Sequence, residues 1–234
     1  LIYRWANERY GKGAGLIATI LFSFSPTVLA HSRFVTTDMP ALFGVLLGTY
    51  FFVKFFGKPS RGRFWFAAVA FGVAQLTKFS LVLIAPLFVL MVIAWGFANS
   101  PSLRSFVVLF IRSLVLMAVC IIIVVWPVYA LHTMNYPPEK QQIDTTFILS
   151  TFGYKPLADF NVWLSGTPVR PYAQYLLGLL MVAQRSSGGN TTYYIDGVSA
   201  EGARSYFPIV YLIKEPLMYI ILTLFAIFLA LRKC

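Results

Sequence analysis

The sequence predicts an all-α membrane protein whose chain crosses the bilayer several times. Three observations indicate this fold class: 59% of the 234 residues are hydrophobic, only 12% are charged, and the apolar residues gather in long runs. A soluble globular domain carries about twice that share of charged residues. The aromatic content of 17% also suits side chains that are solvated by lipid. We expect about six spans and a large extracytoplasmic loop that carries an interfacial helix.

Six apolar runs are the candidate spans. They cover residues 13–31, 39–56, 64–77, 79–98, 106–131 and 216–231. A spanning helix needs about 20 residues, with a range of about 17 to 25. The third run is short, so we expect it to end near Lys78 with tilt or local thinning of the bilayer. Residues 1–13 have the composition of a connection between spans, which predicts that the chain is a fragment with at least one span upstream.

The basic residues are distributed unevenly between the two sides of this arrangement. Following the chain across the membrane places eleven of the 19 Lys and Arg residues on one side, opposed there only by Glu8. An excess of Lys and Arg in short loops marks the cytoplasmic face. The net charge of +11 is therefore a topology signal, and the scattered cations give no reason to expect a nucleic-acid partner. Asp38, Lys78 and residues 132–215 then lie outside the cytoplasm.

Three regions follow from this topology. They are a transmembrane region with the extracytoplasmic Asp38 loop (1–131), an extracytoplasmic loop region (132–215), and the final span with the cytoplasmic end (216–234). Within the loop region, residues 172–183 form an apolar run too short to span, which we interpret as an interfacial helix. The alternative, a seventh span, would put Arg232 and Lys233 on the wrong face.

Asp38 is the first candidate functional residue, because it is the one acid between Glu8 and Glu139 and lies between two apolar runs. Ionisable groups at such positions are functional hypotheses by default, since their burial must be offset by a partner or a ligand. The structural alternative is a helix cap: Thr37 or Asp38 would be the N-cap, and Pro40 suits the first helical turn. Both interpretations stay open at this point.

The residues around Asp38 form a compact polar segment. His31 and Arg33 precede it within one short extracytoplasmic turn. A carboxylate near a cation can hold a divalent metal, or position a phosphate-bearing ligand through that metal. His31 and His132 both lie at outer span ends and are weak candidates for additional metal ligands. No other cofactor is expected, since no nucleotide-binding glycine loop occurs.

Two lysines are candidate anion ligands. Lys78 interrupts two apolar runs, and its alternative role is that of a snorkelling lysine at a span end. Lys214 precedes Pro216 at the start of a helix, where a cation opposes the helix dipole. A residue that is unfavourable locally suggests a ligand.

Four segments, taken in order, resemble one family. They are residues 10–16 (YGKGAGL), 29–40 (LAHSRFVTTDMP), 72–80 (GVAQLTKFS) and 206–216 (YFPIVYLIKEP). The pattern resembles the protein O-mannosyltransferase and aminoarabinose-transferase superfamily of C-type glycosyltransferases, glycosyltransferase family 39, in a bacterial form. The resemblance covers most of the chain, and its most specific parts are Thr-Thr-Asp and Leu-Thr-Lys-Phe-Ser.

The resemblance implies an integral-membrane hexosyltransferase of the bacterial plasma (inner) membrane. Such an enzyme passes a sugar from a polyprenyl-phosphate carrier to an extracytoplasmic acceptor, which is a protein, a lipid or a glycan. Asp38 would lie near the carrier phosphate or its metal, and Arg33, Lys78 and Lys214 would neutralise that phosphate. The loop region would cover the cleft and select the acceptor. Its candidate substrate-contacting residues are Arg170, Arg204 and Tyr206.

One departure from the family pattern concerns the catalytic base. The family uses an acid in the first extracytoplasmic loop, whereas the acid found early in this sequence, Glu8, falls on the cytoplasmic side. We therefore expect the base to lie upstream of Leu1 or to be absent, and the fragment to be inactive alone. The alternative function is a polytopic transporter or flippase subunit that handles lipid-linked substrates. Spans almost free of charge in their middle favour the enzyme.

Overall fold

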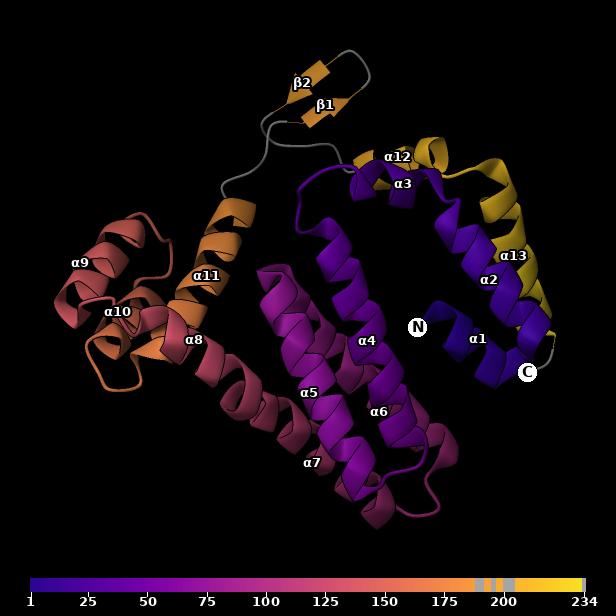
Figure 1. The fold of residues 1–234 in the computed structure, drawn as a ribbon, viewed down its shortest axis with the longest axis horizontal. Helices are drawn as coiled ribbons and strands as arrows, with labels where there is room; N and C mark the ends of the chain where they lie inside the picture. Colours follow the sequence, from indigo (N-terminus) through magenta and orange to yellow (C-terminus); the bar gives the residue numbers. More distant parts are fainter. Residues whose placement is uncertain (188–191, 195–196, 200–204, 233–234) are drawn as a thin grey trace. The chain divides into compact units, whose positions relative to one another are not determined.

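The structure is a computed structural model that describes residues 1–187, 192–194, 197–199 and 205–232 (Figure 1). Most of these residues are helical, and the two short strands β1 (Thr192–Tyr194) and β2 (Gly197–Ser199) pair antiparallel. The chain divides into two compact units, which are described separately below. The first comprises residue 1 and residues 37–184, and the second comprises residues 2–36 and 185–234. The predicted all-α class is confirmed.

The first unit is built around a bundle of apolar helices that lie side by side (Figure 1). Its members are α4 (Asp38–Gly57), α5 (Arg61–Thr77), the 3₁₀ turn η1 (Phe79–Leu83), α6 (Ile84–Asn99) and α7 (Leu103–Cys120). The short connection 58–60 makes α5 return antiparallel to α4. Helix α7 continues through the π turn η2 (Ile121–Val125) into α8 (Trp126–Thr133), so that residues 103–133 form one helical stretch of 31 residues.

Aromatic side chains fill the centre of this bundle. The rings of Phe52 on α4 and Phe88 on α6 stack with their centroids 4.0 Å apart, and both side chains are fully buried. Phe71 on α5 tilts against the same ring of Phe88 at 5.5 Å. Helices in lipid associate through close packing rather than through removal of apolar surface from water. Interlocked rings of this kind therefore hold α4, α5 and α6 together.

Residues 138–184 form a helical assembly within the same unit rather than an open loop. Its helices are α9 (Pro138–Ile148), α10 (Lys155–Ser165) and α11 (Arg170–Ser187). A small apolar cluster joins them, and its buried members are Leu149, Phe152, Ala158, Leu177 and Leu180. Helix α11 contains the predicted helix 172–183 and is longer at both ends. The orientation predicted for it, along the membrane surface, stays a prediction.

The second unit contains two bent helix pairs and one helix before them. Its helices are α1 (Ile2–Tyr10), α2 (Lys12–Ser23), α3 (Pro26–Ser32), α12 (Tyr206–Lys214) and α13 (Leu217–Leu231). Gly11 links α1 to α2 with a φ of +90°, a left-handed conformation that glycine adopts without steric cost. The bend is 56° between α2 and α3, and 109° between α12 and α13. Tyr219 on α13 donates a hydrogen bond of 2.7 Å to the carbonyl of Leu21 on α2.

Fewer helices than predicted are long and apolar enough to cross a membrane. Within the described residues there are three, Asp38–Gly57, Phe79–Asn99 and Leu103–Thr133, or up to five if each bent pair is one span. The expectation of about six spans exceeds this number because the third predicted run, α5, has 17 residues and measures about 26 Å. The hydrocarbon core is about 30 Å thick. Helix α5 also begins with Arg61 and ends at Lys78, where the backbone becomes extended.

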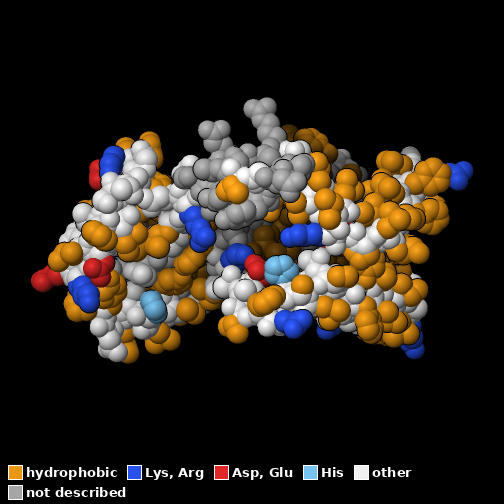
Figure 2. Space-filling model, turned by 90° about the horizontal axis from the view of Figure 1, so that it is seen from above, with side chains coloured by type: hydrophobic (Ala, Val, Ile, Leu, Met, Phe, Trp, Pro, Cys, Tyr) orange, Lys and Arg blue, Asp and Glu red, His pale blue; other side chains and the backbone are white. Residues whose placement is uncertain are grey.

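Apolar side chains are widely exposed on the molecule, as Figure 2 shows for one face. Large aliphatic and aromatic side chains on the apolar helices are more than half exposed, among them Leu16, Ile17, Leu90, Ile122 and Phe228. Extensive exposed apolar surface marks a membrane or protein contact. Together with the apolar helices, it makes the chain a polytopic membrane protein.

Candidate active site

The centre of the candidate site is an ion pair between Asp38 and Lys78. Asp38 is in the first turn of α4, and Lys78 follows the last residue of α5. The Lys78 Nζ lies 2.7 Å from Asp38 Oδ1, and the two side chains are 38% and 40% exposed. The structure thus brings together two of the predicted site residues, which are forty positions apart in the sequence.

Helix ends place both charges favourably. The N-terminus of α4 carries partial positive charge that favours the Asp38 carboxylate, and the C-terminus of α5 carries partial negative charge that favours the Lys78 ammonium. A half-exposed pair of this kind contributes about 0–1 kcal/mol to stability. The ion pair therefore adds little to the stability of the fold.

Close packing of α4 on α5 brings the two residues together. A Cβ atom at Gly44 would lie 2.7 Å from Thr77 Oγ1 and 3.1 Å from the Cα of Ala74. Only a glycine permits α5 to approach α4 this closely near its C-terminus. The Thr77 hydroxyl is itself held by a 2.8 Å hydrogen bond to the Ala74 carbonyl. This close contact between α4 and α5 places Lys78, the residue after Thr77, within reach of Asp38 at the start of α4.

The turn after Lys78 is held from two sides. Lys78 has an extended backbone (φ −162°, ψ 133°), so the helix stops there and the chain continues as η1. Gln75 is buried, and its Nε2 donates a 3.2 Å hydrogen bond to the Leu81 carbonyl of η1. The Gln75 Oε1 accepts a 3.2 Å hydrogen bond from the hydroxyl of Tyr175 on α11. This buried amide joins α5, η1 and α11 around the site.

Helix α11 also packs directly on η1. A Cβ atom at Gly178 would lie 2.1 Å from the ring of Phe79, which means that the ring occupies the space left by the missing side chain. The same ring lies 5.9 Å from that of Tyr175, whose ring is in turn 5.5 Å from Tyr129 on α8. The predicted loop region therefore reaches the lysine of the site through an aromatic contact.

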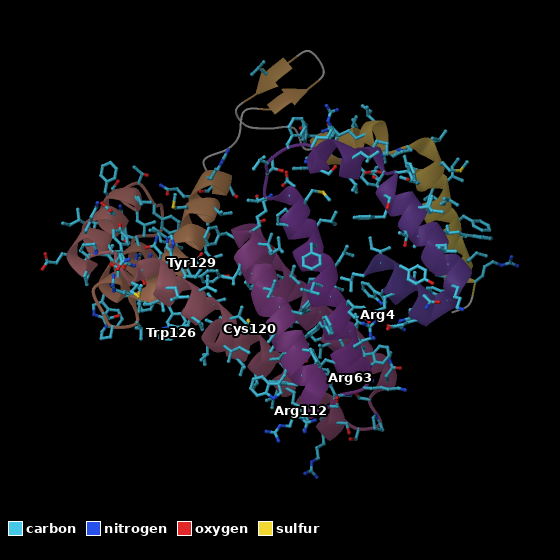
Figure 3. All side chains as sticks on the ribbon, in the orientation of Figure 1. Arg4, Arg63, Arg112, Cys120, Trp126 and Tyr129 are labelled. Carbon is cyan, nitrogen blue, oxygen red and sulfur yellow. The ribbon has the colours of Figure 1, made fainter. Side chains whose placement is uncertain are left out.

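A cleft of about 470 Å³ opens beside Lys78. It is lined by Thr37, Gln75, Leu76, Thr77, Lys78, Phe79, Ser80, Tyr129 and Val182. These residues come from the start of α4, the end of α5, η1, α8 and α11, and Figure 3 labels Tyr129 on its helix. A second, smaller cleft of about 200 Å³ shares Leu76 and Tyr129 and reaches His132. The larger cleft, beside Lys78, combines one cation, several hydroxyl groups and apolar walls.

Three further residues hold or line this site without having been predicted from the sequence: Gln75, Tyr129 and Tyr175. Gln75 lies inside the quoted segment 72–80 and is a buried amide in an apolar run, which is a usable signal. The two tyrosines stand in apolar surroundings with many other aromatic residues. Only the tertiary contacts distinguish them.

Arg170 has a defined environment away from the cleft lining. Its guanidinium donates hydrogen bonds to the carbonyls of Thr133 and Tyr136 and to Gln141 Oε1, the bond to Thr133 being 2.9 Å and that to Gln141 3.1 Å. These carbonyls belong to the C-terminal end of α8 and the turn that follows it. The contacts tie α11 to α8, and the substrate contact predicted for Arg170 stays a prediction.

The other predicted site residues belong to the second unit or lie outside the described residues. Arg33 and Lys214 are exposed at the C-terminal ends of α3 and α12. His31 is in the last turn of α3, and Tyr206 begins α12. The first turn of α3 contacts the C-terminal end of α12, since Thr27 Oγ1 donates a 3.2 Å hydrogen bond to Glu215 Oε1. Arg204 lies outside the described residues.

The described residues around Asp38 do not by themselves form a metal site. Among the described residues, no three His, Cys, Asp or Glu side chains come together as metal ligands. The single carboxylate at the site, that of Asp38, is paired with an ammonium group, whereas Mg²⁺ and Ca²⁺ prefer several oxygen ligands. We therefore derive no step through a metal.

The fold and the cleft define a class: a polytopic helical membrane protein with a cationic site where its apolar helices end. The chain belongs to the dolichyl-phosphate-mannose-protein mannosyltransferase family, whose sequence model matches residues 1–126, just over half of the chain. The matched part contains both Asp38 and Lys78. Comparisons with curated proteins and with solved structures give no match. The predicted family resemblance is confirmed, and the chain is in general terms a membrane glycosyltransferase.

Proposed function

We propose that this glycosyltransferase moves a sugar from a polyprenyl-phosphate carrier to an acceptor outside the cytoplasm, and that the Asp38–Lys78 pair receives the carrier phosphate. The observation that carries the proposal is the half-exposed ion pair at the rim of a cleft with apolar walls. A polyprenyl-phosphate sugar has the same two parts, a phosphodiester and a long apolar chain.

The phosphate of the donor takes the place of Asp38 beside Lys78. In the transfer step an acceptor oxygen attacks the anomeric carbon, and the bond between that carbon and the phosphate oxygen breaks. The bonding electrons leave with the phosphate, so negative charge grows there. A fixed ammonium group in a partly dehydrated cleft stabilises that charge. The released acceptor proton needs a base, and we assign none among the described residues.

Arg33 and Lys214 stay predicted ligands of the carrier phosphate. Both are exposed cations at helix ends of the second unit. The active face lies outside the cytoplasm in the proposed orientation, because the cations at and beside the connections 58–60 and 100–102, among them Lys58, Arg61 and Arg104, are at the other ends of the helices. Labelling of cysteines placed at Lys58 and Thr37 tests this: access to both from the same side of the membrane contradicts the orientation.

Substitution of the pair tests its role. In membranes that carry the protein, with polyprenyl-phosphate mannose as donor, we expect Lys78→Gln to raise the KM for the donor about tenfold or more, since a charge-assisted hydrogen bond contributes about 1.5–3 kcal/mol. Asp38→Asn removes the carboxylate that the phosphate must displace, so it should lower the KM for the donor without changing the amount of protein. The matched control is Lys58→Gln, because Lys58 lies at the opposite end of α4.

A charge exchange separates catalysis from structure. The double variant Asp38→Lys with Lys78→Asp keeps an ion pair between the same two helix ends. If the pair only joins α4 to α5, the exchange restores transfer, and the proposal is wrong. If Lys78 binds the phosphate, the exchanged protein folds and remains inactive.

A further inference from the structure

A separate cleft lies at the other end of the helix bundle from Lys78. It has a volume of about 270 Å³ and is lined by Pro59, Arg104, Ser105, Val108, Leu109 and Arg112. Pro59 is in the connection between α4 and α5, and the other residues are on the first turns of α7. Figure 3 labels Arg112 on that helix. The cleft is therefore independent of the candidate active site.

The charge in this cleft is not balanced within the described part of the chain. Arg104 and Arg112 are both exposed, and neither forms a hydrogen bond or an ion pair with another described residue. Arg63, at the same end of the bundle, is different: its guanidinium donates to the carbonyls of Lys54 and Lys58. Arg63 thus satisfies carbonyl groups at the C-terminal end of α4. The two arginines of α7 remain available to a ligand.

The N-terminus of α7 adds further donors to the cleft. Ser102 is the N-cap, and its Oγ accepts a 3.2 Å hydrogen bond from the Ser105 N–H. The remaining N–H groups of the first turn have no partner inside the helix. A helix N-terminus binds anions through such groups and through its dipole. Arg104 belongs to this turn. Its guanidinium and the N-terminus of the helix can therefore contact the same anion in the cleft.

The walls of the cleft continue into lipid-exposed apolar surface. The helical stretch Leu103–Thr133 has 31 residues and measures about 46 Å, which exceeds the hydrocarbon thickness of about 30 Å. The stretch is therefore long enough for its first turns, which carry Arg104 and Arg112, to reach the headgroup region. Val107, Val108, Ile111, Leu114 and Val115 are all exposed along this part of α7. Cations beside aliphatic surface at this depth match an amphiphile with an anionic head.

We propose that this cleft binds the headgroup of an anionic phospholipid, with the phosphate on Arg104, Arg112 and the N-terminus of α7. The acyl chains run along the exposed aliphatic side chains of the same helix. Binding at this end fixes the depth of α7 in the bilayer, and it is distinct from donor binding near Lys78. The inference does not depend on the proposed function.

Lipid retention by the purified protein tests the site. The protein in detergent is mixed with equal amounts of phosphatidylglycerol and phosphatidylcholine, and bound lipid is measured by native mass spectrometry. We expect preference for phosphatidylglycerol, and a loss of affinity of about fivefold for Arg104→Gln or Arg112→Gln and about 25-fold for both. The matched control is Arg61→Gln, an exposed arginine at the same end that does not line the cleft.

Two further arms keep the result decisive. Val108→Trp fills the cleft and keeps both arginines, so it should also remove the preference for phosphatidylglycerol. The thermal midpoint of each variant in phosphatidylcholine shows whether the variant is folded. Inorganic phosphate distinguishes the source of the anion, because a lipid site prefers the amphiphile and is displaced only at far higher phosphate concentration. Equal retention by the double variant and Arg61→Gln overturns the proposal, and so does displacement by phosphate at the lipid's own concentration.

Discussion

Two glycines of α4, one helical turn apart, should respond in opposite ways to the same substitution. A Cβ atom at Gly44 meets Thr77 Oγ1 at 2.7 Å and the Cα of Ala74 at 3.1 Å. At Gly48 the nearest atom is the Cβ of Ala74 at 3.7 Å, an ordinary contact. Both glycines are buried inside the same helix. Gly48→Ala is therefore the matched control for Gly44→Ala.

The expected magnitudes follow from helix propensity and packing. Replacing a glycine by alanine inside a helix stabilises it by about 0.5–1 kcal/mol, and this gain applies to both positions. An added methyl group in a packed site costs about 1–3 kcal/mol when neighbours cannot move. At Gly44 they cannot move freely, because one neighbour is backbone and the Thr77 hydroxyl is hydrogen-bonded. Gly44→Ala should thus be about 1–3 kcal/mol less stable than Gly48→Ala.

Reversible unfolding in mixed micelles measures this difference, since the free energy of unfolding of each variant is compared under one condition. The gain at Gly48 should appear as a small rise above the unmodified protein. Gly44→Ala should also affect donor binding, because Asp38 lies less than two turns from Gly44. Separation of the two helices there should weaken the Asp38–Lys78 pair and reduce donor binding. If the two variants agree within about 0.5 kcal/mol, the close approach at Gly44 is refuted.

The extramembrane contacts of Tyr136 and Arg170 give two further predictions. Burial, a hydrogen bond to Asp144 and the negative charge of Asp144 raise the pKa of Tyr136 from 10.0 to about 12. The folded state therefore favours the protonated phenol. The stability that this contact contributes is complete below about pH 10 and is lost between about pH 10 and pH 12. Ultraviolet titration of wild type against Tyr136→Phe should show one late-ionising phenol, and ionisation near pH 10 would contradict the contact. Arg170→Ala should lower the free energy of unfolding by about 1–3 kcal/mol, since carbonyls such as that of Thr133 lose a charged donor. Thermal denaturation measures this difference, and an unchanged midpoint would show that the hydrogen bonds of Arg170 do not stabilise the fold.

Sequence patterns alone located most of the helices and part of the site. Long apolar runs fix the class because each run must be solvated by lipid, and five of the six predicted runs correspond to apolar helices or bent pairs that pass as candidate spans. The remaining predicted run, residues 64–77, corresponds to α5. This helix is too short to be a candidate span, although its position was predicted. Asp38 and Lys78 were singled out because an isolated charge beside apolar runs is visible without a structure. The match to the mannosyltransferase family agrees with the resemblance found in the same segments.

Contacts between distant residues could not be derived in this way. Nothing in the pattern indicates that Tyr175 donates to Gln75, one hundred positions earlier, or that Phe79 occupies the space beside Gly178. The predicted loop region is packed by its own apolar cluster, which local hydrophobicity describes only as scattered aromatic residues. Such contacts depend on the complementarity of surfaces, which a single sequence does not encode locally.

Composition and the length of the apolar runs are enough to show that the chain is helical and solvated by lipid, because each long apolar run needs an apolar solvent. The same runs show which charges are isolated from the others. The pairing of Asp38 with Lys78 is visible only in the folded protein, because it depends on how closely α4 packs against α5. That distance is set by the missing side chain of Gly44.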